Sequence, residues 1–396
     1  MKSEKIKQLD KENVMQTYAR FDVVIDRGEG ATLFSPEGKE YIDFSSGIGV
    51  NSIGYGNKKW ADAIYAQAMK LQHISNLYYS EPYAKLAEAL IKRTGMKNVF
   101  FANAGADANE GMIKLARKYS FDKFGKGKST IISLNQSFHG RTITTLAATG
   151  QDVFHNFFFP FTEGFKHVQA NDIDALKKEK TDDVCAILIE LIQGEGGVLP
   201  LDPEYVKKAA EFCKDNDLLL LIDEVQTGIG RTGTLFAYQQ YGIKPDVISF
   251  AKGIAGGLPL GGFIANEKCS AVLTAGTHAT TFGGNPVAAA GAVEVLKQLD
   301  DTALKDVVEK GKYIKEKILS WGMSCIGEIR GKGLMLGISL NSEVPREIAQ
   351  ICVENGLLIL TAGADALRIL PPLTITYKEV DKGLLILKNV LEDNQK

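Results

Sequence analysis

The sequence lacks both an excess of charge of one sign and any long apolar run. Its 396 residues include 46 lysines and arginines against 48 aspartates and glutamates. Without a net positive field, the chain has no long-range attraction for nucleic acid or an anionic membrane surface. No apolar stretch approaches the roughly 20 residues that cross a bilayer, and the polar start MKSEKIKQLDKEN lacks a signal-like apolar segment. We therefore expect no nucleic-acid partner, no membrane span and a cytoplasmic protein.

Cysteine and histidine are also scarce, with five residues of each. The cysteines are scattered and show no CxxC spacing, and the histidines include no HxxxH or HExxH pair. These absences argue against a disulfide framework and against a zinc site. We expect the cysteines to behave as small reduced hydrophobes, and we expect no metal.

The apolar residues that are present, 45% of the chain, gather into short runs that predict an α/β fold. Residues 32–44 read as an antiparallel hairpin with a turn at 36–39. From about residue 60, helical segments alternate with strand-like runs, which is typical of a parallel sheet covered by helices. These runs are NVFFA (98–102), STIISL (129–134), CAILIE (185–190), LLLLID (218–223) and DVISFA (246–251). Later runs at 334–340 and 356–361 predict a smaller α+β domain.

Asp223 and Lys252 each stand at the end of one of these apolar runs. Ligands of open parallel sheets collect beyond the carboxyl ends of the strands, so both side chains should face one crevice. A lysine at an apolar edge can attack an aldehyde, and an aspartate can hold a proton on a heterocyclic nitrogen. This pair is what pyridoxal phosphate chemistry requires. The alternative is an ordinary helix cap and a surface lysine.

The surrounding residues favour the chemical interpretation. The segment LLLIDEVQTGIGRTGTLFAYQQYGIKPDVISFAKGIAGGLPLGG (219–262) resembles the signature region of the class III, fold-type I aminotransferases, which use pyridoxal phosphate, and the similarity runs from about Tyr18 to Leu373. The resemblance implies a large domain with a mainly parallel seven-stranded sheet and a small α+β domain. We expect residues 1–55 to join the small domain, 56–290 to form the cofactor-binding domain and 291–396 to complete the small domain.

The same resemblance assigns roles in the cofactor site. It implies that Lys252 forms the Schiff base with the cofactor, Asp223 pairs with the pyridinium nitrogen, Val225 packs on one ring face and Gln226 approaches the ring hydroxyl. The segment 228–233 also spells GxGxxG, a weak sign of a dinucleotide site. It lies in mid-chain rather than opening a first βαβ unit, which disfavours a nicotinamide or flavin cofactor.

The run NAGADANE (103–110) joins a predicted strand to a predicted helix. Small residues at such a turn let backbone N–H groups close on a phosphate, so Gly105 and Ala106 are the expected donors. The family pattern resembles N-S-G-(A/T)-E-A-N-E, from which Ala104 and Asp107 depart. An ordinary helix start is the alternative.

A second phosphate contact comes from HATTFGGNP (278–286), which resembles the family motif H-x-S-T-(F/Y)-G-G-N-P. In the family this threonine reaches the phosphate of the neighbouring subunit. Thr281 is therefore expected there, in a homodimer with shared active sites. The plainer interpretation of GGNP is a turn followed by a helix start.

Two arginines are expected to bind substrate carboxylates. SFHGR (137–141) resembles a motif in which the aromatic residue, here Phe138, stacks on the cofactor and the arginine, here Arg141, meets a carboxylate. LRILPP (367–372) resembles the element that supplies an arginine, here Arg368, for the α-carboxylate of 2-oxoglutarate. Glu195 matches the family position that pairs with this arginine when an ω-amino substrate binds.

The segments 17–24 and 73–79 most resemble acetylornithine aminotransferases within the class and place Tyr18 in the substrate site. The expected reaction is transamination from N2-acetyl-L-ornithine to 2-oxoglutarate, in arginine biosynthesis. Other class III donors remain open, namely ornithine, succinylornithine, 4-aminobutyrate and diaminopelargonate. A catalytically weak, cofactor-binding regulatory protein is the alternative of a different class.

Overall fold

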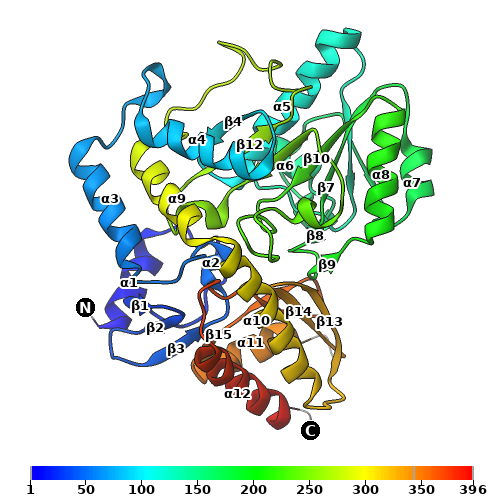
Figure 1. Ribbon diagram of the computed structural model, residues 1–396. Helices are drawn as coiled ribbons and strands as arrows, with labels where there is room; N and C mark the ends of the chain where they lie inside the picture. Colours follow the sequence, from blue (N-terminus) through cyan, green and yellow to red (C-terminus); the bar gives the residue numbers. More distant parts are fainter. Residues whose placement is uncertain (1, 342–343, 395–396) are drawn as a thin grey trace.

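The computed structural model describes residues 2–341 and 344–394 (Figure 1). Its centre is a seven-stranded sheet in the order β4-β12-β11-β10-β7-β5-β6. The strands are β4 (Asn98–Ala102), β5 (Thr130–Leu134), β6 (Phe165–Val168), β7 (Val184–Glu190), β10 (Leu219–Asp223), β11 (Val247–Phe250) and β12 (Gly261–Ala265). All neighbours are parallel except β12, which is antiparallel to β11 and β4. The predicted seven-stranded, mainly parallel sheet is confirmed.

The central strands are buried at every position and mostly apolar because both faces of the sheet are covered. On β10, Leu219 and Leu221 pack in one cluster with helix α5 (Gly105–Phe124), while Leu220 and Ile222 pack in another with helix α8 (Pro203–Asp215). Further helices surround the sheet: α3 (Lys58–Lys70), α4 (Glu81–Thr94), α6 (Ile143–Ala148), α7 (Ile173–Glu179) and α9 (Pro286–Gln298). Helices α3 and α4 pack against α9 (Figure 1).

A second, smaller domain combines both ends of the chain. Its antiparallel sheet has the order β13-β14-β17-β16, formed by β13 (Ile326–Lys332), β14 (Met335–Leu340), β16 (Leu360–Ala362) and β17 (Ala366–Ile369). Another sheet has the order β1-β2-β3-β15, formed by β1 (Arg27–Glu29), β2 (Thr32–Phe34), β3 (Glu40–Asp43) and β15 (Leu357–Leu358). Since β15 pairs with β3, the N-terminal strands lie with the C-terminal elements. The boundaries at residues 55 and 290 remain a prediction.

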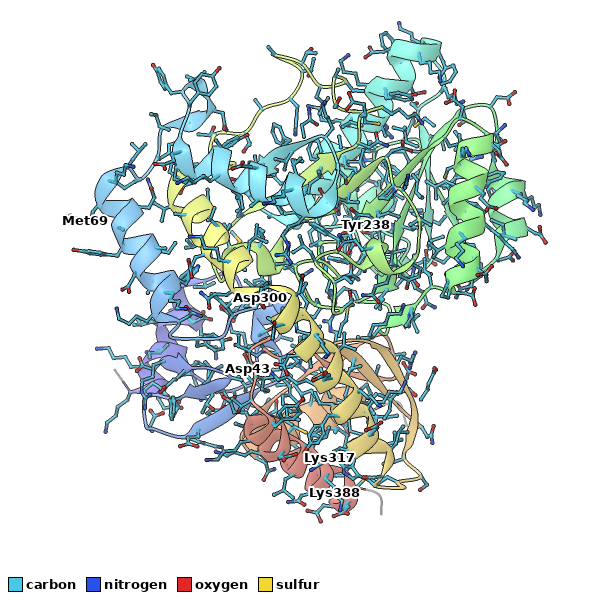
Figure 2. All side chains as sticks on the ribbon, in the orientation of Figure 1. Asp43, Met69, Tyr238, Asp300, Lys317 and Lys388 are labelled. Carbon is cyan, nitrogen blue, oxygen red and sulfur yellow. The ribbon has the colours of Figure 1, made fainter. Side chains whose placement is uncertain are left out.

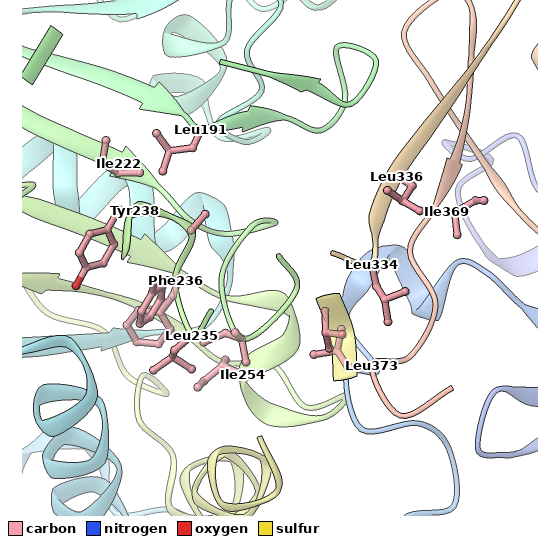
Figure 3. Packing of buried hydrophobic residues seen from close by; sticks show 14 of the residues in the cluster. Leu191, Ile222, Leu235, Phe236, Tyr238, Ile254, Leu334, Leu336, Ile369 and Leu373 are labelled. Carbon is pink, nitrogen blue, oxygen red and sulfur yellow. The ribbon is translucent and has the colours of Figure 1, made fainter. Parts of the chain in front are cut away.

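Helices α10 (Asp301–Leu319), α11 (Pro345–Glu354) and α12 (Tyr377–Asp393) accompany these sheets. Asp300 precedes α10 and caps it, since its side chain accepts a hydrogen bond from Ala303 N (Figure 2). The buried apolar cluster runs from Ile222 and Phe236 beside the parallel sheet to Leu336 and Ile369 of the smaller domain (Figure 3). The two domains therefore share one continuous core.

Short elements complete the chain: α1 (Ser3–Asn13), α2 (Ser46–Gly49), β8 (Ile192–Gln193), β9 (Leu199–Pro200) and the 3₁₀ helices η1 (Ser75–Leu77), η2 (Asp152–Phe154), η3 (Ala237–Gln240) and η4 (Lys252–Ala255).

Within residues 2–341 and 344–394, no helix has both the length and the apolarity needed to span a membrane. In the same ranges, no group of three or more histidine, cysteine, aspartate or glutamate side chains is arranged to hold a metal ion.

Two details differ from the sequence interpretation. The run 356–361 was expected to be one strand, but β15 and β16 belong to different sheets, because Leu357 and Leu358 pair with β3 while Leu360 to Ala362 pair with β17. The N-terminus was expected to be a polar arm, but it begins with helix α1. That helix buries none of its residues, so no apolar stripe signalled it.

Candidate active site

Three parallel strands, β7, β10 and β11, deliver the candidate residues to one edge of the central sheet. Asp223 ends β10, Glu190 ends β7 and pairs with Asp223 in register, and Lys252 follows β11. These groups line a cavity of about 450 Å³, a size that suits a cofactor. The candidate residues that line it are Gly105, Ala106, Asn109, Phe138, His139, Arg141, Glu190, Asp223, Val225, Gln226 and Lys252.

Lys252 opens the short helix η4 with a φ of +44°, which is an uncommon conformation for a residue with a side chain. Burial lowers the pKa of its amine, and the charges of Glu195 and Asp223 only partly oppose that effect. Among the described residues, no hydrogen bond or ion pair engages the amine. A buried lysine that lines the cavity, has a lowered pKa and has no bonded partner among these residues is suited to attack a carbonyl group.

Asp223 is buried and accepts hydrogen bonds from four groups. His139 Nδ1 donates at 2.8 Å and Asn109 Nδ2 at 2.7 Å to one oxygen, and Val225 N at 2.9 Å and Ser249 Oγ at 3.4 Å donate to the other. Burial alone would raise the pKa of Asp223, but the hydrogen bond and charge of His139 hold it below its ordinary value. The carboxylate is thus kept ionised, as a partner of a protonated ring nitrogen must be.

The N-terminus of α5 forms the cradle for an anion. Its N-cap residue Ala104 has no side chain that could cap the first N–H groups. A Cβ atom at Gly105 would lie 2.6 Å from Val225 Cγ1, so only glycine lets the helix start approach this wall. Asp107 accepts hydrogen bonds from the main chain and side chain of Asn103 at 3.1 and 2.6 Å. The departure at Asp107 therefore braces the turn that precedes the cradle.

These features fit pyridoxal phosphate. The helix N-terminus offers backbone donors for a phosphate, Asp223 offers an anion for the pyridine nitrogen, and Lys252 offers an amine for the aldehyde. Val225 and Phe138 both line the same cavity, and either can contact a flat ring.

The segment 228–233, which spells GxGxxG, has another use. It lies in the connection from β10 to β11, which contains only η3 and does not open an α-helix. A Cβ atom at Gly233 would lie 2.2 Å from Val308 of α10, so this glycine allows close packing on the smaller domain. Arg231 in the same segment donates to the carbonyl groups of Leu334 and Pro371 at 3.0 and 2.6 Å. The segment is a domain contact and not a phosphate loop.

Arg368 and Glu195 form an ion pair beside the cavity. Arg368 Nη1 lies 2.6 Å from Glu195 Oε1, and Nη2 lies 3.3 Å from Oε2. Gln226 connects the pair to the cavity, since its Oε1 accepts from Arg368 Nη1 at 3.2 Å and its Nε2 donates to Glu195 at 3.4 Å. Burial would raise the pKa of Glu195, but Arg368 holds it below the ordinary value. The pairing expected from the sequence is present.

Arg141 stands at the exposed rim of the cavity. Its guanidinium carbon lies 3.9 Å from the centre of the Phe154 ring and 5.5 Å from that of Phe138. These rings hold the planar group without using its N–H donors, which remain available for a carboxylate. A second cavity, of about 820 Å³, opens beyond it and is lined by Phe154, Glu195 and Arg330, among others.

Two expected residues do not reach the cavity within one chain. Tyr18 is 72% exposed and is not among the lining residues. Thr281 lies in the exposed segment before α9 and also does not line the cavity. Their roles remain predictions.

Three lining residues were missed from the sequence: Glu190, His139 and Asn109. Glu190 ends the run CAILIE in the same way that Asp223 ends LLLLID, so the strand-end rule could have found it. His139 lay within the SFHGR motif but was weighed only as a metal ligand. Asn109 matches an asparagine of the family pattern quoted for 103–110, but that match does not reveal its contact with Asp223, which it reaches across the fold from one turn into α5.

Comparison with known proteins agrees with this site. The family model described as Aminotransferase class-III matches residues 14–391. An acetylornithine aminotransferase from Haemophilus ducreyi is 49% identical over 99% of this chain and 100% of its own, and one from Caldanaerobacter subterraneus is 46% identical over 97% and 98%.

Solved structures give the same result. The ornithine aminotransferase from Toxoplasma gondii, a structure with partial occupancy of pyridoxal phosphate, matches with a TM-score of 0.94 and 32% identity over 99% of this chain and 96% of that chain. The N-acetylornithine aminotransferase from Stenotrophomonas maltophilia matches with a TM-score of 0.85 and 34% identity over 98% of both chains. Together with the matched family model and the cavity built around Asp223 and Lys252, these results show that the chain belongs to the class III aminotransferases, enzymes that depend on pyridoxal phosphate.

Proposed function

We propose that this chain transfers the terminal amino group of N2-acetyl-L-ornithine to 2-oxoglutarate, forming N-acetyl-L-glutamate 5-semialdehyde and L-glutamate in arginine biosynthesis. The names of the relatives with 46–49% identity support this donor. The observation that carries the proposal is the Arg368–Glu195 ion pair beside the cavity that Lys252 lines. Such a pair suits an enzyme that must accept an ω-amine in one half-reaction and an α-keto acid in the other.

In this proposal, five residues hold the cofactor. The N–H groups of Gly105 and Ala106 bind its phosphate, the Asp223 carboxylate keeps its ring nitrogen protonated, and Val225 and Phe138 contact its ring. Once bound, pyridoxal phosphate supplies an aldehyde that takes up the amino group and a ring that withdraws electrons from the reacting carbon.

Lys252 has two tasks. Its buried amine would hold the cofactor between turnovers, and after displacement by the donor it would move the proton at the reacting carbon. Gln226 lies between Lys252's cavity and the ion pair, where it can also meet the ring hydroxyl. The lowered pKa of Lys252, which burial causes, suits both tasks.

The ion pair then selects the substrate for each half-reaction. While Glu195 neutralises Arg368, this arginine cannot bind an α-carboxylate, and the part of the pocket beside it admits the ω-amine of the donor. When 2-oxoglutarate enters, Glu195 releases Arg368, which binds its α-carboxylate, and Arg141 binds the distal carboxylate. For the donor, Arg141 binds the carboxylate of the acylated end, with Tyr18 nearby. The cavity of about 820 Å³ beyond Glu195 offers room for the acyl group.

We further propose a cytoplasmic homodimer in which Thr281 of one subunit completes the phosphate site of the other. The cytoplasm is supported by four buried thiols, Cys185, Cys213, Cys269 and Cys352, which need no oxidising compartment. The dimer is supported by large apolar side chains exposed near Thr281: Leu77, Tyr78, Tyr79 and Phe282.

A panel of amino donors tests the proposed function. Each donor is supplied with 2-oxoglutarate and the glutamate formed is measured, with Lys252→Ala as the blank. N2-acetyl-L-ornithine should give the highest kcat/KM, by at least about tenfold over ornithine, 4-aminobutyrate and diaminopelargonate. A different preferred donor would replace the proposed one and leave the class unchanged. Cofactor binding without turnover of any donor would instead favour a regulatory protein.

A further inference from the structure

Glu190 is a second buried carboxyl group in the active-site cavity, and the proposed reaction assigns it no role. It ends β7, is 5% exposed and lines the cavity with Lys252 and Asp223. It is also the register partner of Asp223 on the adjacent parallel strand. Neighbouring strands lie only about 4.8 Å apart, so the two carboxyl groups share one small, poorly hydrated space.

The hydrogen-bond donors in this space are divided unequally. Asp223 accepts from His139, Asn109, Val225 N and Ser249. Glu190 accepts one hydrogen bond, at 2.9 Å, from Phe138 N to its Oε2. Two buried carboxylates this close do not both ionise readily, and the one with more donors takes the charge. The proton therefore belongs to Glu190.

The hydrogen bond to Phe138 N connects this carboxyl group to the ring of Phe138. The loop that carries Phe138 turns sharply, with φ of +64° at Gln136 and +141° at Gly140. Other main-chain polar groups of this loop form hydrogen bonds with side chains that lie outside the loop. His139 N donates to Thr149 Oγ1, and Ser137 O accepts from Gln151 Nε2. For Phe138 N, the corresponding partner is Glu190. Losing that acceptor leaves a buried N–H unpaired and frees the loop to move.

The groups that face Glu190 come from several elements. Asp223 lies on β10, Lys252 on η4 and Glu195 in the segment after β8, and all three act on it electrostatically. Burial raises the pKa of Glu190 well above its ordinary value, and the charge of Asp223 raises it further. Phe138 N and Lys252 act in the opposite direction without overcoming burial. The geometry and the electrostatics agree on which carboxyl group is neutral.

We propose that Glu190 is a positioning residue held in its protonated form, which fixes the main chain of Phe138 and leaves Asp223 as the ionised member of the carboxyl pair. The proton sits on Oε1, for which no hydrogen-bond partner exists among the described residues. This role concerns the cofactor site and does not depend on which amine is the donor. It predicts that an uncharged amide can replace Glu190, whereas a shortened side chain cannot.

The test compares Glu190→Gln, which mimics the protonated acid, with Glu190→Ala. The infrared spectrum of the wild-type protein without cofactor should contain a protonated-carboxyl band at neutral pH that Glu190→Gln removes. Glu195→Gln is the control, because Glu195 is ionised against Arg368 and its loss should leave that band in place. Cofactor affinity, titrated by absorbance, should change less than about threefold in Glu190→Gln and weaken at least about tenfold in Glu190→Ala.

The pH profile of kcat/KM supplies a readout that a merely structural role would not move. Wild type should lose activity at alkaline pH as Glu190 ionises, and Glu190→Gln should lack that loss. This comparison stands even if Glu190→Ala does not fold. A protonated-carboxyl band that is unchanged in Glu190→Gln, or a Glu190→Gln variant as impaired as Glu190→Ala, would overturn the proposal. Absence of turnover with every donor would count against the proposed function but would leave the infrared result intact.

Discussion

Asp223 depends on the residues around it to stay ionised in a buried site. Four donors surround its carboxylate. Burial acts to raise the pKa of Asp223, but the hydrogen bond and charge of His139, together with the hydrogen bonds from Val225 N and Asn109, outweigh burial and hold it below its ordinary value. The amide in Asp223→Asn keeps the shape and loses the charge. We expect kcat to fall at least about a hundredfold, as for other well-placed electrostatic groups.

The control for this prediction is Asp246→Asn. Asp246 accepts a hydrogen bond from Leu220 N of the same strand β10 and does not line the active-site cavity. Asp246→Asn should lower the free energy of unfolding, and its effect on kcat should be smaller than that of Asp223→Asn. A near-normal kcat in Asp223→Asn would mean that another group pairs with the ring nitrogen.

Arg368 and Glu195 should affect the two half-reactions differently. Losing a charge-assisted contact to a desolvated carboxylate costs on the order of 2–5 kcal/mol of binding free energy. Arg368→Ala should therefore weaken the binding of 2-oxoglutarate strongly and spare the half-reaction with the donor. Glu195→Ala leaves Arg368 unpaired, so it should shift preference toward α-amino donors such as glutamate. Single-turnover spectra with each substrate measure both effects. Equal impairment of the two half-reactions, with no shift in donor, would rule out the ion-pair switch.

At the scale of elements, the sequence predicted best where one physical signal dominated. The central strands β7, β10 and β11 are buried at every position and mostly apolar because helices cover both faces. Such runs are hard to mistake when glycine and polar turns separate them. The connection 224–246 joins the adjacent parallel strands β10 and β11. Its irregular path depends on buried contacts with the smaller domain, which a local pattern does not reveal.

In the candidate site too, a local pattern reveals some residues, whereas others depend on contacts between distant parts of the chain. Asp223 and Lys252 could be found because Asp223 ends a strand, Lys252 closely follows one, and both lie in a recognisable motif. Asn109 also lies in a motif, but its task is a 2.7 Å contact across 114 positions of sequence, which no local motif reveals. Glu190 falls between these cases. Its place at a strand end was visible, but its protonation depends on a neighbour on another strand.

The edge of the central sheet should be sensitive to acid. His167 on β6 lies 2.8 Å from Ser133 Oγ on β5, and burial lowers the pKa of His167 from 6.5 to about 4. The unfolded chain takes up this proton near pH 6.5, whereas the folded chain resists until near pH 4. Stability is therefore complete above the unfolded pKa and is lost as pH falls toward the folded one.

Urea unfolding of wild type and His167→Gln measures this contribution. As the pH falls from about 6.5 to about 5, His167 should lower the free energy of unfolding of the wild type by up to about 2 kcal/mol. His167→Gln should lack this contribution to the pH dependence. An identical pH dependence in both proteins would show that His167 is protonated equally in the folded and unfolded chains.

At the scale of the whole molecule, one chain supplies most of a site but not all of what the family resemblance implies. The cavity, the anion cradle and the ion pair are present within one chain, while Thr281 lies away from that chain's cavity. A dimer with shared sites would bring the missing threonine from the partner. Sedimentation should therefore give about twice the monomer mass of 43.1 kDa.

Mixed dimers test the sharing directly. Lys252→Ala should be inactive because it lacks the amine. Thr281→Ala should bind the cofactor more weakly, by about tenfold for one lost hydrogen bond to a charged group. A dimer with one subunit of each variant contains one site with both Lys252 and Thr281 intact. That site should recover normal cofactor affinity, whereas affinity that stays at the level of Thr281→Ala would show that the threonine serves its own chain.

The most direct measurement of the central claim is borohydride reduction of the purified, cofactor-saturated protein, followed by peptide mass analysis. Reduction converts an imine into a stable bond and so marks the lysine that holds pyridoxal phosphate. The account predicts one labelled peptide, with the cofactor on Lys252, and no label in Lys252→Ala. Label on any other lysine, or no label at saturating cofactor, would contradict the assignment of this cavity as the active site.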